Sequence, residues 1–135
     1  MSKLILKPGR EKSLVNRHPW VFSGAVDKVE GEAKPGDPID IHAAGGEFLA
    51  RAFYNPNSQI VGRVLSFQPE PLDRAFFRGR IAAALEFRRE LTAGWCPGYA
   101  RRLITAEGDG LPGLTVDVYA GRLVRRLTSR GMSLR

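Results

Sequence analysis

The chain has 135 residues, of which 43% are hydrophobic, so it is long enough for one domain with a packed core, or for one small domain with an appendage. Its formal net charge is +7, and neither an apolar run of about 18 residues nor a signal-peptide pattern is present, which argues against a membrane or secreted protein. A single cysteine, Cys96, excludes an internal disulfide framework and a multi-cysteine metal site, and we expect a cytoplasmic protein.

The positive charge is unevenly distributed along the chain. Residues 118–135 contain five arginines and no acidic residue, whereas residues 27–47 contain six acidic residues and two lysines. The first 17 residues hold five basic side chains and one acidic one. A basic N-terminal face is typical of a protein that binds a phosphate backbone, although a solvated surface would have the same composition.

Short strands are predicted in the N-terminal half. Leu4–Leu6 forms an apolar strand, Ile39 and Ile41 alternate with polar residues, and Glu47–Tyr54 and Ile60–Phe67 read as two further strands, with Gly62 marking a bulge or a close backbone approach. Residues 27–37 are acidic and contain a turn. Four or five short strands before Pro69 indicate a small barrel or sandwich.

Arg17–Gly24 has the sequence RHPWVFSG, which is not ordinary strand patterning. If the segment is extended, Trp20 and Phe22 lie on the same side. Two interpretations remain open. The two rings either fill a small core, which is the usual environment of large aromatic residues, or form a stacking surface for nucleotides beside Arg17 and His18.

The run Pro69-Glu70-Pro71 marks a boundary, and an amphipathic helix is predicted over Asp73–Ala93. Asp73 is the expected N-cap and Gly94 the expected C-terminal stop. The rest of the helix carries an arginine-rich face, which we expect to be solvated. Its members are Arg74, Arg78, Arg80, Arg88 and Arg89.

A glycine-rich corner follows over Arg102–Asp117. Residues 108–113 match the pattern G-x-G-x-x-G, but a dinucleotide site requires a helix to begin inside the pattern. Pro112 and the β-branched Thr115 instead predict a strand–loop–strand corner. Asp109 and Asp117 are accordingly interpreted as turn and strand-end residues rather than as a catalytic carboxylate pair.

The remaining residues offer little catalytic chemistry. A strand over residues 114–119, a turn at Ala120-Gly121 and a strand at Arg122–Thr128 precede a frayed tail at Ser129–Arg135. Cys96 is expected to be an inert thiol. His18 and His42 stand in no nucleophile or metal pattern, so a small free-standing enzyme is a poor interpretation.

Three segments together resemble one family: Arg17–Gly24, Ala52–Ser66 (AFYNPNSQIVGRVLS) and Arg102–Asp117 (RLITAEGDGLPGLTVD). They are similar to the N-terminal part of the bacterial S-adenosylmethionine-dependent methyltransferases that modify C5 of a cytosine in large-subunit (23S) ribosomal RNA. The resemblance extends from residue 3 to about residue 124.

The resemblance implies a mainly β structure with some α (α+β). Residues 1–69 would form a PUA-like RNA-binding β-barrel, and residues 70–135 a connector, a partial β-β-α-β-β module with one long amphipathic helix. The family uses S-adenosylmethionine, but we expect neither cofactor, metal nor catalytic residues in this chain, because it ends before the position of a catalytic domain. Truncation is therefore expected.

The resemblance implies RNA, of ribosomal origin, as the expected partner. The expected contact residues are Arg10, Lys12, Arg17, His18 and Trp20, followed by Arg51 and Arg63. An alternative of another class is a protein–protein module that forms a homodimer through residues 70–135, because the apolar side of the helix would otherwise be uncovered.

Overall fold

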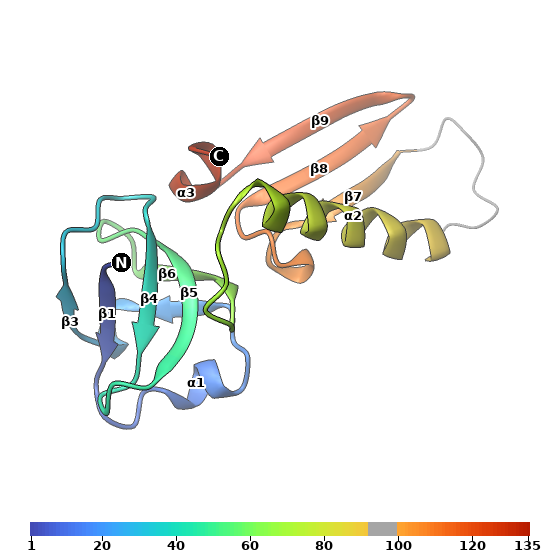
Figure 1. The fold of residues 1–135 in the computed structure, drawn as a ribbon. Helices are drawn as coiled ribbons and strands as arrows, with labels where there is room; N and C mark the ends of the chain where they lie inside the picture. The colour runs from blue at the N-terminus through green and yellow to red at the C-terminus, as the bar shows by residue number, and fades with distance from the viewer. Residues whose placement is uncertain (92–99) are drawn as a thin grey trace. The chain divides into compact units, whose positions relative to one another are not determined.

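The structure is a computed structural model that describes residues 1–91 and 100–135. The chain divides into two compact units, one formed by residues 1–70 with 134–135 and the other by residues 71–133 (Figure 1). The predictions for Gly94 and Cys96 fall on residues that lie outside the described ones. No helix in the described part of the chain combines the length and the apolar character needed to cross a bilayer.

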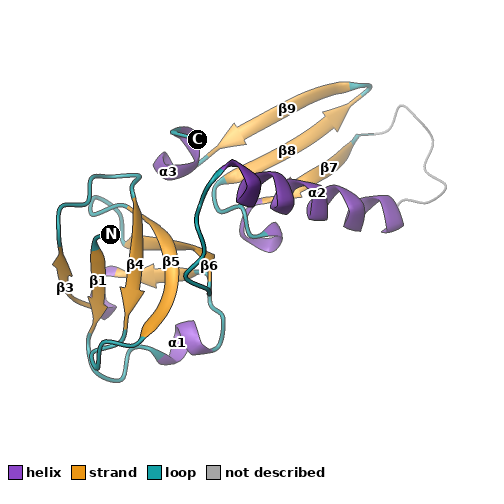
Figure 2. Ribbon diagram, in the orientation of Figure 1, coloured by secondary structure: helices purple, strands orange, loops and turns teal. Residues whose placement is uncertain are grey.

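The first unit is built on one curled sheet of six strands (Figure 2). The strands are β1 (Lys3–Leu6), β2 (Trp20–Phe22), β3 (Val26–Glu30), β4 (Pro38–His42), β5 (Phe48–Tyr54) and β6 (Ile60–Ser66). Their order is β2-β6-β5-β4-β1-β3, and all neighbours are antiparallel except the β1–β4 pair. The predicted α+β class is confirmed, and β2 and β3 are the two ends of this half-barrel.

Alternating side chains form the core of this sheet. Ile39 and Ile41 of β4 and Ala50 and Ala52 of β5 are fully buried, as the period-two pattern predicts. A short helix, α1 (Lys12–Val15), adds the buried side chain of Leu14. Burial of each large aliphatic side chain contributes roughly 1.5–3 kcal/mol. The core therefore fixes which side chains of every strand must point outward.

A strand was missed in the acidic segment. Residues 27–30 belong to β3, which pairs antiparallel with β1. β3 lies at the end of the strand order, and most of its side chains are exposed. An edge strand with little buried surface needs no apolar alternation, and charged residues on an edge oppose aggregation. The sequence pattern on which strand prediction rests is therefore absent here.

The second unit consists of a long helix on a three-stranded antiparallel sheet (Figure 2). The strands lie in the order β7 (Arg101–Thr105), β8 (Leu114–Tyr119), β9 (Arg122–Leu127). The helix α2 (Arg74–Leu91) packs against the edge strand β7. The N-cap prediction is confirmed, because the Phe76 N–H donates to Asp73 Oδ1 over 2.9 Å. Ala84 and Ile104 are buried in the core of this unit.

The glycine-rich corner is a strand–loop–strand connection, as predicted. A short 3-10 turn, η2 (Ala106–Asp109), follows β7, and no α-helix begins inside the glycine pattern. Gly110 and Gly113 both have positive φ, 67° and 84°. A Cβ on Gly113 would lie 2.3 Å from the Ser129 hydroxyl, so the close approach of the two segments requires glycine at this position.

Arg88 does not belong to a solvated arginine face, which corrects the sequence prediction. Its guanidinium binds both carboxylate oxygens of Asp109 at 2.9 Å, and the two side chains are only 15% and 10% exposed. It also donates to the Arg102 carbonyl and to the Thr105 hydroxyl, each over 3.1 Å. Asp109 in turn accepts the Thr105 N–H over 2.6 Å. The pair thus ties α2 to the outer edge of β7.

The end of the chain is not a frayed tail, contrary to the prediction. Residues Arg130–Ser133 form a single helical turn, α3, in which Met132 is buried. The Ser129 hydroxyl donates to the Pro112 carbonyl over 3.1 Å and accepts the Met132 N–H over 3.3 Å. These bonds attach the segment to the glycine corner, and such long-range contacts leave no periodic signal in seven residues.

The Arg88–Asp109 pair generates the first prediction. Arg88→Met removes one partner of a largely buried ion pair, and the loss of unfolding free energy is expected to be about 3 kcal/mol. Arg89→Met is the matched control, since the neighbouring Arg89 is 80% exposed and pairs with Glu86, which is itself 54% exposed. We expect it to cost at most about 0.5 kcal/mol. Urea unfolding of both variants measures the difference, and equal losses would contradict the structural role of Arg88.

Candidate nucleic-acid interface

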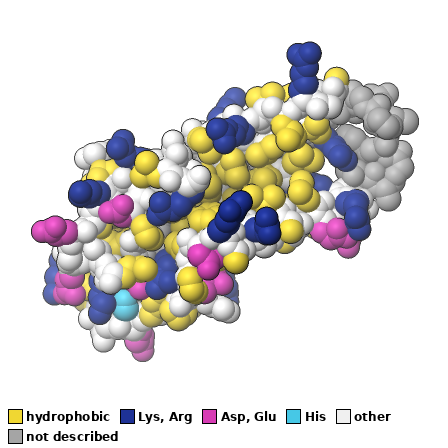
Figure 3. Space-filling model, turned by 45° about the horizontal axis from the view of Figure 1, so that its top comes forward, with side chains coloured by type: hydrophobic (Ala, Val, Ile, Leu, Met, Phe, Trp, Pro, Cys, Tyr) yellow, Lys and Arg dark blue, Asp and Glu magenta, His cyan; other side chains and the backbone are white. Residues whose placement is uncertain are grey.

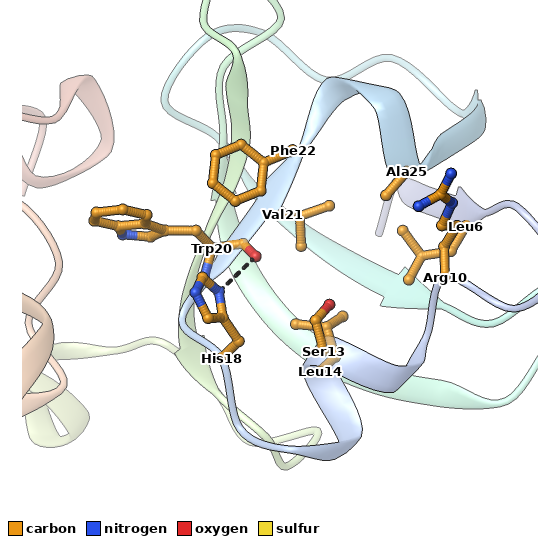
Figure 4. Close-up of a pocket in the computed structure, with 9 residues that line it drawn as sticks. All are labelled: Leu6, Arg10, Ser13, Leu14, His18, Trp20, Val21, Phe22 and Ala25. Atoms are coloured by element: carbon orange, nitrogen blue, oxygen red, sulfur yellow. Dashed lines mark hydrogen bonds between the residues drawn. The ribbon is translucent and has the colours of Figure 1, made fainter.

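The candidate site is built around the aromatic residues of β2. Val21 points into the core and is buried, so Trp20 and Phe22 lie on the outer face of the sheet (Figure 4). Trp20 is half-buried and Phe22 is 48% exposed. Of the two interpretations left open by the sequence, the core-filling one is therefore wrong for Phe22, while Trp20 is partly buried but stands outside the core cluster of the unit.

His18, Trp20 and Phe22 form a compact cluster of rings. The three centroids are separated by 6.0 Å for His18–Trp20 and by 6.3 Å for each pair that includes Phe22. His18 Nδ1 lies 3.2 Å from both the backbone nitrogen and the backbone oxygen of Trp20. This contact holds the imidazole ring against the start of the strand, and Trp20 meets both neighbours edge-on. Edge-on packing is one of the two arrangements that aromatic pairs prefer, the other being offset stacking.

A small cavity of about 130 Å³ opens beside the ring cluster (Figure 4). Its lining combines buried aliphatic side chains with the aromatic cluster, one arginine and one hydroxyl. The residues are Leu6, Arg10, Ser13, Leu14, His18, Trp20, Val21, Phe22 and Ala25. A hollow with apolar walls and a cation at its border suits a flat, partly apolar group attached to an anion.

Cationic side chains surround the aromatic residues. Arg63 is the cross-strand partner of Trp20, and its guanidinium carbon lies 5.8 Å from the Trp20 ring centroid. Arg17 lies 5.0 Å from the centroid of Phe67. Lys12 is exposed on α1, and Arg10 lines the cavity. Of the seven predicted contact residues, the structure thus brings four together, with His18 and Trp20 in the ring cluster, Arg63 beside Trp20 and Arg10 in the adjoining cavity.

Arg51, the seventh predicted residue, is engaged in a different interaction. It forms two hydrogen bonds with its cross-strand partner Asp40, at 2.6 and 3.0 Å, and donates to the Glu70 carbonyl. Its side chain is 11% exposed. The hydrogen bond that Arg51 donates to Asp40 raises the pKa of the Arg51 guanidinium, which is consistent with a committed ion pair. Arg51 therefore stabilises the β4–β5 pairing and is left out of the interface.

The backbone of Arg17 adopts an unusual conformation, with φ at 63°. It follows α1, where the Arg17 N–H donates to the Leu14 carbonyl and the His18 N–H to the Ser13 carbonyl, both over 2.9 Å. This is a Schellman ending, in which the left-handed position is usually occupied by glycine. An arginine there carries a steric cost of about 1–2 kcal/mol. Strain of this kind is most often retained at functional positions.

Two neighbouring aromatic residues were not among the predicted contacts. Phe22 had a usable signal, because it follows Trp20 at the two-residue spacing of a strand. Phe67, over which Arg17 lies, had none, since the contact joins residues 50 positions apart in the chain. The site holds no acidic residue among its cavity-lining side chains. Within the described ranges, no group of His, Cys, Asp or Glu is arranged to hold a metal ion.

Comparisons with known proteins identify related sequences. Residues 4–67 match the family of the PUA-like domain. A ribosomal RNA large subunit methyltransferase I from Vibrio cholerae is 48% identical over 129 residues, which are 95% of this chain and 32% of the relative. The protein of the same name from Yersinia pseudotuberculosis is 50% identical over 131 residues, covering 96% of this chain and 33% of the relative. The chain thus spans about a third of the length of these curated relatives.

Solved structures give the same fold. A Streptococcus mutans protein described as a SAM-dependent methyltransferase superposes with a TM-score of 0.82 over 99% of this chain and 35% of its own, at 19% identity. A second chain, described as a methyltransferase in complex with SAH, matches with the same TM-score and identity over 34% of its length. At this identity the likeness speaks for the fold alone. Together with the curated relatives, it confirms the resemblance predicted from the sequence.

The strained position of Arg17 gives the second prediction. Arg17→Gly and Arg17→Ala both delete the side chain and its contact with Phe67, but only glycine relieves the left-handed strain. After the larger unfolded-state entropy of glycine is subtracted, the glycine variant should be more stable than the alanine variant by about 0.5–1 kcal/mol. Thermal and urea unfolding compare the two variants. An alanine variant as stable as the glycine variant would show that the position carries no strain.

Proposed function

We propose that this chain binds RNA, and specifically ribosomal RNA. It contains a PUA-like domain, and nearly its whole length is homologous to part of the ribosomal RNA large subunit methyltransferase I proteins. The observation that carries the proposal is the outward-facing cluster of His18, Trp20 and Phe22, with Arg63 beside Trp20. RNA-binding proteins recognise unpaired bases by stacking them on such rings and on guanidinium planes.

The ring cluster supports binding of an unpaired base. Phe22 is about half exposed, and the adjoining cavity has aliphatic walls. Every nucleobase has an apolar face that can stack on an aromatic ring. Because Trp20 meets its neighbours edge-on, the rings of the cluster are not stacked face to face on one another. The sequence-tolerant character of stacking means that the cluster would select for an unpaired base rather than for one particular base.

The cations around the cluster support binding of the backbone. Arg10, Lys12 and Arg17 belong to an N-terminal segment of 17 residues with five basic groups and one acid. Neutralised phosphates release counterions, so affinity falls as the salt concentration rises. We assign Arg10, Lys12, Arg17 and Arg63 to phosphate contacts and His18 and Trp20 to base contacts.

The proposed division of labour follows the chain. Residues 1–69 would be the RNA-binding module and residues 70–135 a connector, and the whole would serve methyl transfer to large-subunit ribosomal RNA in the cytoplasm. We assign no S-adenosylmethionine contact to these residues, because the glycine corner runs between two strands and offers no helix N-terminus to a phosphate or carboxylate.

A second candidate function is self-association through the second unit. Phe77, Ile81 and Leu85 line a shallow surface depression of about 420 Å³ on α2, beside Arg74 and Arg78. Apolar side chains gather on the visible face of this unit, with lysine and arginine side chains around them (Figure 3). Contiguous exposed apolar surface often marks a protein contact. Light scattering tests this candidate, and a strictly monomeric chain at high concentration would rule it out.

The ring cluster gives the third prediction. Trp20→Ala should weaken binding of an RNA hairpin with an unpaired loop by at least about fivefold, because one stacked base is worth about 1–3 kcal/mol. Phe48→Ala is the matched control. Phe48 makes a similar edge-on contact with a histidine of the same unit, His42, with centroids 5.8 Å apart. Fluorescence anisotropy at two salt concentrations measures both variants after thermal melts have confirmed that they fold.

The outcome separates the proposal from nonspecific attraction. A selective loss in the Trp20 variant, larger for the looped hairpin than for a fully paired RNA, is expected. Equal affinities of wild type, Trp20→Ala and Phe48→Ala, or the absence of RNA binding by the wild type, would refute the proposed site.

A further inference from the structure

Alternate side chains of the three strands point to opposite faces of the sheet of the second unit, and arginines occur on both, with Arg101 and Arg125 on the side of Val116 and Val118. Leu114, Val116 and Val118 of β8 point to one face, together with the buried Ile104 of β7, which is the cross-strand partner of Val116. Since α2 packs against β7 and contributes the buried Ala84, this face is the one directed toward the helix. The alternate residues therefore form an outward face, which no part of the function proposed above uses.

The outward face is basic and carries one aromatic ring. The register places Arg102 opposite Asp117, Arg126 opposite Thr115 and Arg122 opposite Tyr119, all on this side. Val124, opposite Asp117, completes the face. The three arginines are exposed, and Tyr119 is 49% exposed. Asp117 is the single acidic side chain that β7, β8 and β9 direct to this face.

The one acidic residue does not cancel the positive charge of the face. Asp117 is bound by Arg102 through two contacts of 2.8 and 3.2 Å. The hydrogen bond from Arg102 lowers the pKa of the Asp117 carboxyl, and Arg126 lowers it further through its charge. Asp117 therefore stays ionised and orients Arg102 on the surface. Arg122 and Arg126 add two positive charges that this single carboxylate leaves uncompensated.

We infer that the outward face of β7–β9 is a second RNA-contact surface, on which Arg122 and Arg126 hold phosphates of one backbone beside the Arg102–Asp117 pair and Tyr119 stacks on a base. Arg122 and Arg126 are four residues apart on one strand, so their Cα atoms are separated by about 13 Å, and Arg102 lies two strands away, at about 10 Å in the other direction. Such a spread matches several phosphates of one backbone better than it matches a single carboxylate.

An acidic protein segment is the competing partner, and the geometry is less suited to it. An added strand would pair with the open edge of β9, and its side chains would alternate between the two faces. Only every second acidic residue would then meet the arginines of the outward face. The inference rests on the proposed RNA binding but concerns different residues in a different unit, so the two can be tested separately.

The experiment uses two adjacent arginines that point to opposite faces. Arg126→Gln and Arg125→Gln remove the same charge from neighbouring positions of β9, where Arg126 faces outward opposite Thr115 and Arg125 lies opposite Val116 on the helix side. Arg126→Gln should weaken binding of the looped RNA hairpin about threefold and reduce the slope of log affinity against log salt by roughly 0.7–0.9. Adding Arg122→Gln should double the change in slope, and Arg125→Gln should change neither quantity appreciably.

Trp20→Ala, measured in parallel, separates this inference from the function proposed for the first unit. If Trp20→Ala weakens binding while Arg126→Gln and Arg125→Gln behave alike, the second surface is refuted and the first stands. If Arg126→Gln alone weakens binding, the second surface stands without the first. Ultraviolet crosslinking of the wild-type chain should place RNA on the peptide that contains Tyr119. An absence of that crosslink would overturn the inference. So would the finding that Arg126→Gln weakens binding of an acidic peptide but leaves RNA binding unchanged.

Discussion

The two-residue period of the β-strand is the constraint on which both surfaces depend. In β2, the side chain of Val21 is buried in the core, so the side chains of Trp20 and Phe22 point to the opposite face of the sheet. In β8, the side of Val116 faces the helix, so that Thr115, Asp117 and Tyr119 must face away from it. A one-residue slip in either strand would exchange the two sides and bury the polar groups. The cores of the two units therefore hold the candidate binding groups in place, although none of these groups belongs to a core.

Within the second unit, one ion pair performs a related task at the edge of the sheet. An edge strand presents unpaired N–H and C=O groups, which attract other strands unless they are covered. Arg88 donates a hydrogen bond to the Arg102 carbonyl, and Asp109 accepts one from the Thr105 N–H. The ion pair between α2 and η2 therefore covers the outer edge of β7. The glycine corner brings Asp109 to this position. The segment 108–113, which matches a nucleotide-binding pattern in the sequence, thus connects β7 to β8 and helps to cover the exposed edge of β7.

The sequence predicted those features that depend on neighbours along the chain. The alternation in β4 and β5, the N-cap at Asp73 and the strand–loop–strand corner all follow from local patterns. β3 was missed because a charged edge strand has no buried alternation, and the turn at Arg130–Ser133 because the bonds of Ser129 reach back to Pro112. The orientation of Trp20 could not be decided either, since alternation says which residues share a side and not which side is covered.

The arginines show most clearly what sequence reasoning cannot supply. Arg51 and Arg63 look alike in the sequence, each lying within an apolar strand of the same sheet. Arg51 stands opposite Asp40 and is bound by it, whereas Arg63 stands opposite Trp20 and lies near its ring.

The same rule separates the arginines of the second unit, where Arg102 lies opposite Asp117 while Arg126 lies opposite Thr115. A cation that faces a carboxylate across a strand pair spends much of its interaction energy within the fold. A cation that faces a hydroxyl, as Arg126 does, has no carboxylate directly opposite it on the neighbouring strand. The surroundings of each arginine are therefore set by strand register, a property of residue pairs distant in the chain, which only the folded structure reveals.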